Sequence, residues 1–267
     1  MSKRPLILIT NDDGIASPGL AATAAALDPL GELLIVAPSN QQTSMSRSRS
    51  QNKELDGKLS EYTVVFQKQS WPGIAANATP ALSVEHAIQE ISERPIDLVV
   101  SGINYGVNIG TCVTVSGTIG AALEAAENKI PALAISQELD RAEYHKYSVV
   151  DFSAAIHFTQ LFSKKVLECS LPFDVDLLKI EIPLNASPQT EWVVTKQDRL
   201  VYYQPYFDPE LERFHTPHRI RHRPQKGKYL EKGTDAYALA QGLVSVTPLS
   251  LDLSSRTELS KLFELLK

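Results

Sequence analysis

Two adjacent aspartates, Asp12 and Asp13, stand directly after the first apolar run of the chain, residues 6–10, and directly before Gly14. Neighbouring carboxylates repel each other unless a cation or a proton lies between them. Oxygen ligands of this kind suit hard cations such as Mg²⁺ or Mn²⁺. The pair therefore predicts a divalent-metal site, and the alternative is an Asp-rich turn in which Gly14 takes a positive φ.

Three further polar segments carry groups suited to a metal or a phosphate. The glycine-rich run 101–110 contains Asn104, whose side-chain carbonyl is a neutral metal ligand, although the run alone is equally typical of a flexible loop. The run 116–120 opens an alanine-rich stretch, where free helix amides could bind phosphate or where ordinary N-capping could suffice. The serine-rich run 38–48 adds hydroxyl and amide oxygens, but alone it is typical of a solvated loop. Together with the acid pair, the three segments favour a metal and phosphate site.

The elements that must position these segments show the pattern of βαβ units. Short apolar runs alternate with alanine-rich runs at helical spacing, which is typical of a parallel sheet with helices on both faces. We expect strands at 6–10, 33–37, 98–101, 132–136 and 177–182, and helices at 18–27, 80–91, 116–128 and 150–167. The predicted fold class is α/β, a three-layer Rossmann-like and mostly parallel sheet. Ligands of such sheets bind beyond the carboxyl ends of the strands, where the four segments lie.

The chain divides into three expected parts. Residues 1–186 form the α/β metal- and phosphate-binding core. Residues 187–232 are polar, aromatic and basic, which predicts an extended arm or hairpin that serves oligomerisation. Residues 233–267 are expected to return to the core. In the last two parts we expect strands at 191–195, 200–203 and 244–248 and a final helix at 258–266.

Composition excludes several classes of protein. A formal net charge of −5 disfavours a protein that binds a nucleic acid polymer. No apolar run approaches the roughly 20 residues that cross a bilayer, so no membrane partner is expected. The apolar run near the start is too short for a secretory signal, and only two cysteines, Cys112 and Cys169, are present. These features predict a cytoplasmic protein.

The ordered motifs resemble those of the SurE family of nucleotidases. They are the strand ending in Asn-Asp-Asp-Gly at 11–14, the Ser-Gly-Ile-Asn loop at 101–104 and the Ser-Gly-Thr helix start at 116–118. The resemblance covers residues 6–135 and resumes at 180–183 and from 233 to 249. It implies a phosphatase that hydrolyses nucleoside 5′-monophosphates to nucleoside and phosphate, with 3′-monophosphates and polyphosphate as further candidate substrates.

The resemblance also implies roles for individual residues. One divalent ion per subunit, Mg²⁺ or Mn²⁺, is bound by Asp12 and Asp13 together with Asn104 and Thr43, and Ser44 is the alternative to Thr43. The two aspartates are also the implied catalytic groups. The implied phosphate-binding residues are Asn11, Asn108, Ser116, Gly117 and Thr118. A homodimer or homotetramer that exchanges C-terminal segments is implied as well.

The chain departs from the family pattern at two places. Ala78-Thr79-Pro80 followed by Leu82 replaces Gly-Thr-Pro and an acid, and Val115 stands where a polar or aromatic residue is common. We expect these departures to affect the preference for base or sugar more than the metal chemistry.

Other phosphoryl-transfer and hydrolytic classes use related patterns. A phosphatase of the haloacid dehalogenase type has a nucleophilic Asp where this chain has Asn11, and asparagine cannot form an acyl phosphate. A receiver domain has its phosphoacceptor Asp after a central strand, where this chain has Ser101 to Asn104. No Gly-x-Ser-x-Gly elbow precedes a helix. Water is therefore the expected nucleophile.

Two alternatives remain, which are a metal site at a histidine cluster and a non-catalytic function. His218 and His222 would share one face of a helix, a spacing found at zinc sites, and His215 lies nearby. Pro217 interrupts the cluster and no cysteine or acid completes it, which favours a solvated basic arm. A nucleotide- or metal-binding module without activity could share the fold. The intact acid pair and Asn104 favour an enzyme.

Overall fold

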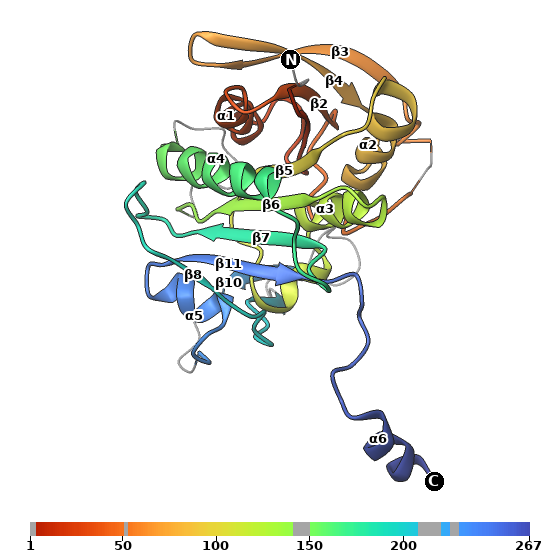
Figure 1. Ribbon diagram of the computed structural model, residues 1–267, viewed down its shortest axis with the longest axis vertical. Coiled ribbons are helices and arrows are strands. Elements are labelled where there is room, and N and C mark those ends of the chain that lie inside the picture. The colour runs from red at the N-terminus through yellow and green to blue at the C-terminus, as the bar shows by residue number, and fades with distance from the viewer. Residues whose placement is uncertain (1–3, 51–52, 141–149, 208–219, 225–229) are drawn as a thin grey trace.

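The computed structural model describes residues 4–50, 53–140, 150–207, 220–224 and 230–267. A nine-stranded sheet of order β3-β4-β2-β1-β5-β6-β7-β11-β8 forms the centre of the fold (Figure 1). Its strands are β1 (Leu6–Thr10), β2 (Glu32–Pro38), β3 (Leu59–Phe66), β4 (Gln69–Ala76), β5 (Leu98–Tyr105), β6 (Ala132–Gln137), β7 (Leu177–Ile182), β8 (Trp192–Val194) and β11 (Val244–Leu249). The α-helices are α1 (Pro18–Leu27), α2 (Pro80–His86), α3 (Gly117–Glu127), α4 (Ser153–Glu168), α5 (Asp235–Ala240) and α6 (Leu259–Leu266).

The middle of the sheet is parallel. β4, β2, β1, β5, β6 and β7 pair in parallel, whereas β3 and β11 pair antiparallel with β4 and β7. Every residue of β1 and β6 is buried, as expected for strands that are covered on both faces. The predicted α/β class with a mostly parallel sheet is confirmed.

Helices cover both faces of the sheet. On one face α1 and α4 pack over a core that includes Ile7 and Ile9, and on the other face α2 and α3 pack near Leu8. Neighbouring residues of a strand point to opposite faces, so β1 contributes to both cores. Full burial of such a side chain stabilises the fold by about 1.5–3 kcal/mol.

Side-chain caps define where the helices begin. Ser17, Thr79 and Ser116 precede α1, α2 and α3, and each side-chain oxygen accepts a hydrogen bond from an amide of the following turn. Such caps satisfy amides that have no partner within the helix. The helix expected at 80–91 is an α-helix over its first seven residues and a π-helix over its last five, Ala87–Ile91.

The structure contains a hairpin that the sequence patterns did not predict. β3 and β4 pair antiparallel along their whole length at one edge of the sheet. Most of β3 is exposed, with Val64 as its buried residue, so β3 lacks the continuous apolar run that marks the central strands. The expectation for β5 was also too short, because the strand continues through the glycine-rich run to Tyr105.

The arm is shorter than expected. β8 belongs to the central sheet, where it pairs in parallel with β11, so the first part of 187–232 lies in the body of the protein. The strand expected at 200–203 is wrong, because β9 (Tyr203–Phe207) begins where that expectation ended. β9 pairs antiparallel with β10 (Ile220–Pro224), which is the expected hairpin. His215 and His218 lie outside the described residues.

The final helix does not return to the core as expected. α6 has no buried residue and lies apart from the body of the chain (Figure 1). Its apolar residues, including Leu262 and Phe263, are exposed. Its amphipathic pattern correctly predicts a helix, but none of the residues that the structure describes covers the apolar face. Among the described residues, no helix has the length and hydropathy needed to cross a bilayer.

Candidate metal and phosphate site

Three adjacent strands bring the polar segments together. β2, β1 and β5 are neighbours in the sheet, and their carboxyl ends lead into the serine-rich loop, the acid pair and the glycine-rich run. Asn11 shapes the turn after β1, because its side chain donates to the carbonyl of Gly14 and accepts from the amide of Gly14, each at 3.1 Å. The turn presents Asp12 and Asp13 at the sheet edge.

Asp12 contacts the first turn of α3. The hydroxyl of Thr118 donates to Oδ1 of Asp12 at 2.6 Å. Gly117 lies so close that an added Cβ would stand 2.7 Å from Cβ and 2.8 Å from Oδ2 of Asp12. The positive end of the helix therefore faces this carboxylate. Burial raises the pKa of Asp12, and the bond from Thr118 opposes the rise.

Asp13 is held from two sides. The amide of Tyr105 donates to Oδ2 of Asp13 at 3.0 Å, and the side chain of Gln41 donates to Oδ1 at 3.3 Å. Burial, and next the charge of Asp12, raise the pKa of Asp13 to about 7. Two carboxylates that are each about 95% buried are costly to ionise together, and a cation removes that cost. The pair fits a hard divalent ion.

The serine-rich loop reaches the acids through its backbone. The amide of Gln42 donates to the carbonyl of Asp12 at 2.6 Å. Thr43 comes next and is exposed, so its hydroxyl is available at this edge of the sheet. Further along, the amide of Ser46 donates to the carbonyl of Val115 at 3.1 Å. The loop therefore bridges the acid turn and the start of α3.

An ion cluster around the buried Glu124 anchors the same loop to α3. Arg47 Nε lies 2.9 Å from Glu124 Oε2, and Arg49 contacts Glu124 Oε1 at 2.7 Å. The side chain of Glu124 is fully buried, so the two guanidinium groups supply the charge that it needs in the interior. The sequence patterns did not single out Gln41 or this cluster, because both depend on the path of the loop.

Asn104 and Asn108 lie on the glycine-rich run. Asn104 is half-buried, and its amide nitrogen donates to the carbonyl of Gly106 at 2.9 Å, which leaves its side-chain oxygen to act as an acceptor. Asn108 is buried, and its side chain donates to Ser136 on β6 at 2.9 Å. The assignments of Asn104 to metal binding and of Asn108 and Asn11 to phosphate binding stay predictions.

The ligand set for a metal is carboxylate and neutral oxygen. Within the described ranges, no group of three or more His, Cys, Asp and Glu residues is placed to hold an ion. Within these ranges, the further ligands expected beside Asp12 and Asp13 are the neutral oxygens of Asn104 and Thr43. This composition is typical of Mg²⁺ and Mn²⁺ sites rather than of zinc sites.

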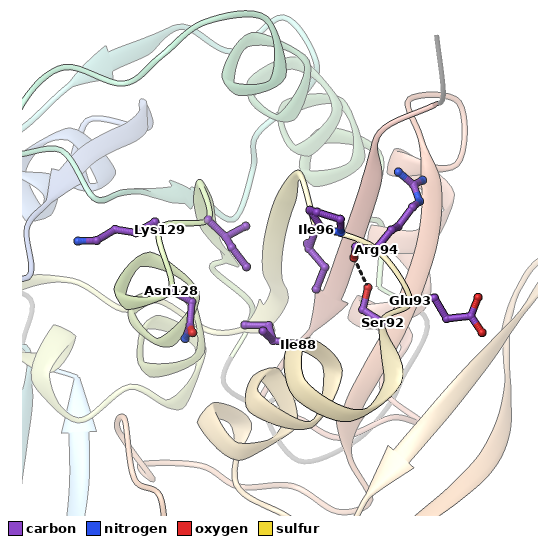
Figure 2. A pocket seen from close by; sticks show the side chains of 9 residues that line it. Ile88, Ser92, Glu93, Arg94, Ile96, Asn128 and Lys129 are labelled. Carbon is purple, nitrogen blue, oxygen red and sulfur yellow. Dashed lines mark hydrogen bonds between the residues drawn. The ribbon is translucent and has the colours of Figure 1, made fainter. Parts of the chain in front are cut away.

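A separate cavity lies at the opposite edge of the sheet. It has a volume of about 470 Å³ and is bordered by Pro95 and Ile96, just before β5, and by Ile130, just before β6. Figure 2 shows that Glu93 and Lys129 point outward at its rim. Arg94 is already paired with Glu32 at 2.7 Å. The hydroxyl of Ser92 donates to the carbonyl of Arg94 at 2.6 Å, so the polar groups of this cavity do not converge as the acid pair does, and the acid pair remains the candidate site.

Comparison with known proteins finds relatives that match nearly the whole chain. The model of the family described as "Survival protein SurE" matches residues 7–204. The 5′-nucleotidase SurE of Thermococcus kodakarensis is 38% identical over 262 residues, which are 97% of this chain and 98% of the relative. The 5′-nucleotidase SurE of Methanothrix thermoacetophila is 37% identical, with 98% of each chain covered.

A solved structure shows the same fold. The crystal structure of the SurE protein from Aquifex aeolicus matches with a TM-score of 0.74 and 30% sequence identity, and the match covers 98% of this chain and 100% of that one. Sequence and fold match these proteins over nearly the whole chain, and the chain therefore belongs to the SurE family.

Proposed function

We propose that the protein is a divalent-metal-dependent 5′-nucleotidase that hydrolyses nucleoside 5′-monophosphates to nucleoside and phosphate. The observation that carries the proposal is the buried pair Asp12 and Asp13 in contact with Gly117 and Thr118 at the start of α3. This arrangement joins a cation site to a helix N-terminus, which attracts phosphate. The names of the relatives support the 5′-monophosphate as substrate.

Different residues of the chain would bind the metal, accept a proton and stabilise the phosphoryl group during hydrolysis. Asp12, Asp13, Asn104 and Thr43 would hold one Mg²⁺ or Mn²⁺ ion per subunit. When bound, such an ion supplies positive charge to the phosphoryl oxygens and lowers the pKa of a bound water. One aspartate accepts the proton of the attacking water, and the first turn of α3 stabilises the developing charge on the phosphoryl oxygens.

The buried asparagine beside the acids limits the mechanism. Asn11 is committed to Gly14 and has no carboxylate to attack phosphorus, so water attacks directly and no phosphorylated enzyme forms. Hydrolysis of 3′-monophosphates and polyphosphate by the same site is part of the proposal. Val115 is half exposed beside Ser116, so it is placed to influence the preference for the base.

Chelation tests the metal in this proposal. EDTA should abolish the release of phosphate from nucleoside 5′-monophosphates, and excess Mg²⁺ or Mn²⁺ should restore it, because two buried carboxylates without a cation would repel the phosphate of the substrate. The measurement is phosphate release at constant ionic strength across 5′- and 3′-nucleotides and polyphosphate. Full hydrolysis in EDTA would remove the metal from the mechanism. Metal binding without any hydrolysis would favour a non-catalytic module.

We also propose a homodimer or homotetramer in the cytoplasm. The exposed fractions of Trp192, Val194 and Ile220, at the base of the arm and on its hairpin, are 44%, 67% and 58%. Exposed apolar side chains of this size are typical of residues that lie at an interface. Cys112 and Cys169 are free thiols, which supports a reducing compartment.

Shortening the arm tests the assembly. Replacement of residues 203–228 by a short Gly-Ser linker should lower the molar mass found by light scattering to that of a smaller assembly, since it removes the hairpin. The intact chain at micromolar concentration is the reference. A monomeric intact chain, or a shortened chain that assembles unchanged, would contradict the role of the arm.

A further inference from the structure

A second buried charged cluster lies beside the glycine-rich run. Its members are Lys179 and Glu181 on β7 and Asp235 at the first position of α5, and all three side chains are fully buried. Lys179 Nζ lies 2.8 Å from Asp235 Oδ2 and 3.7 Å from Glu181 Oε1. None of the three belongs to the acid pair or to the start of α3.

The cluster is not explained by stability. Removing a charge from water costs several kcal/mol, and apolar residues of similar volume often stabilise a core as well as a buried ion pair does. Burial raises the pKa of Glu181 to about 7, although the charge of Lys179 and the amide of Asn108 oppose the rise. Because the burial of these charges is unfavourable, their role is expected in the hydrogen bonds that the two carboxylates make outside the cluster.

Both carboxylates hold backbone amides of the glycine-rich run. Glu181 Oε2 accepts from the amide of Asn108 at 3.0 Å, and Asp235 Oδ2 accepts from the amide of Gly110 at 3.1 Å. The side chain of Gln197 donates to the carbonyl of Gly110 at 3.0 Å. The backbone of the run is therefore held at Asn108 and at Gly110 by carboxylate oxygens. Carboxylates form stronger hydrogen bonds than neutral acceptors do.

The run needs such fixing from outside. Gly106 and Gly110 both have a positive φ. Glycine adopts positive and negative φ about equally easily, so these two residues do not fix the path of the backbone by themselves. The stretch between them also contains no regular hydrogen-bonded element, because β5 ends at Tyr105 and the 3₁₀ turn starts at Gly110. Asn108 lies within this stretch, and Asn104 lies on β5, where its side chain is oriented by the bond to the carbonyl of Gly106. The placement of both side chains therefore depends on how the backbone of 106–110 is held.

We propose that Lys179, Glu181 and Asp235 are positioning residues that fix the backbone of 106–110 and so hold Asn104 and Asn108 in the nucleotidase site. The proposal rests on the proposed function for the roles of the two asparagines. Lys179 balances the charge of the two carboxylates, which would otherwise repel each other and separate. None of the three touches the substrate in this scheme.

The first test compares two replacements of Glu181. In Glu181→Gln the amide oxygen can still accept from the amide of Asn108, whereas Glu181→Leu keeps the volume but offers no acceptor. We expect Glu181→Leu to lower kcat about tenfold with little change in KM, as for a displaced catalytic group, and Glu181→Gln to stay within about threefold of wild type. Hydrogen–deuterium exchange of the peptide 104–112 should be about tenfold faster in Glu181→Leu alone.

The second test uses Asp235→Asn. An asparagine that keeps Oδ1 still accepts from the amides of Asp198 and Ala236, each at 2.8 Å in the wild type, so the start of α5 is preserved. The amide that replaces Oδ2 cannot accept from Gly110 or pair with Lys179. We expect faster exchange in 104–112 and a lower kcat, as for Glu181→Leu.

Thr195→Val is the matched control. Thr195 is buried in the same part of the sheet and bonds to Ser245 and Thr247 at 2.7 and 2.8 Å, but not to the run 106–110. Its replacement should lower the free energy of unfolding without changing kcat or exchange in 104–112. Equal effects of Glu181→Gln and Glu181→Leu, or unchanged exchange in both Glu181→Leu and Asp235→Asn, would overturn the proposal. An inactive wild-type protein would contradict the proposed function instead, and the exchange comparison would still decide on the cluster.

Discussion

Replacing either Asp12 or Asp13 with asparagine is expected to lower kcat by about 100-fold or more, because each change removes a charged ligand whose cation stabilises the transition state by several kcal/mol. Asparagine keeps the volume and one acceptor oxygen. The bond from Thr118 to Asp12 and the bond from Tyr105 to Asp13 can therefore be kept. The loss should appear in kcat at saturating Mg²⁺ and nucleotide.

The same variants should not be less stable when metal is absent. Each replacement removes the repulsion between two buried carboxylates, so the melting temperature in EDTA should equal or exceed that of the wild type. Asp97→Asn is the control, since Asp97 accepts from the amide of Leu6 at 2.7 Å at the opposite edge of the sheet. Its kcat should be unchanged. A kcat within about threefold of wild type in Asp12→Asn or Asp13→Asn would exclude that residue from the metal chemistry.

The second large effect is expected from Gly117→Ala. A Cβ at this position would meet Cβ and Oδ2 of Asp12 at 2.7 and 2.8 Å, closer than carbon and oxygen atoms approach without displacement. Because the contact includes Cβ, rotation of the carboxylate cannot relieve it, and the turn after β1 must shift. We expect a loss of about 100-fold in kcat, the size that follows a displacement of about 1 Å in an active site.

Gly117→Ala should lower the free energy of unfolding by no more than about 2.5 kcal/mol. The added methyl costs about 1–3 kcal/mol of overpacking, and the higher helix propensity of alanine offsets about 0.5–1 kcal/mol of it. The matched control is Gly73→Ala on β4, where the nearest atom to an added Cβ is a methyl of Val64 at 3.2 Å. Full activity of Gly117→Ala would show that the close approach of α3 to Asp12 is not needed for hydrolysis.

The central strands and helix starts could be predicted because each has a local cause. β1, β7 and α1 begin and end at the residues expected from their apolar runs and from Pro18. β3 could not be predicted in this way, since it is an edge strand whose exposed residues carry no apolar run. The position of α6 depends on the surface against which its apolar face packs. The spacing of apolar residues predicts the helix but not that surface.

Some residues of the candidate site could likewise be predicted from local patterns, and others could not. Asp12, Asp13 and Asn104 could be singled out because residues that follow neighbouring parallel strands meet at one edge of the sheet. The contact of Gln41 with Asp13 depends on the turn of a loop whose sequence is compatible with many paths. The pair of Lys179 with Asp235 joins residues 56 positions apart, and no local pattern predicts such a partner.

The arm leaves and rejoins the body at one place. The amide of Lys196 donates to the carbonyl of Gly233 at 2.9 Å, and the amide of Asp235 donates to the carbonyl of Lys196 at 2.9 Å. These two hydrogen bonds hold the ends of the segment 197–232 together, and they do not depend on the length of that segment. Each doubling of the length of a flexible segment with joined ends costs only about 0.6 kcal/mol. We therefore expect a reporter domain that is inserted in the hairpin to leave phosphate release unchanged.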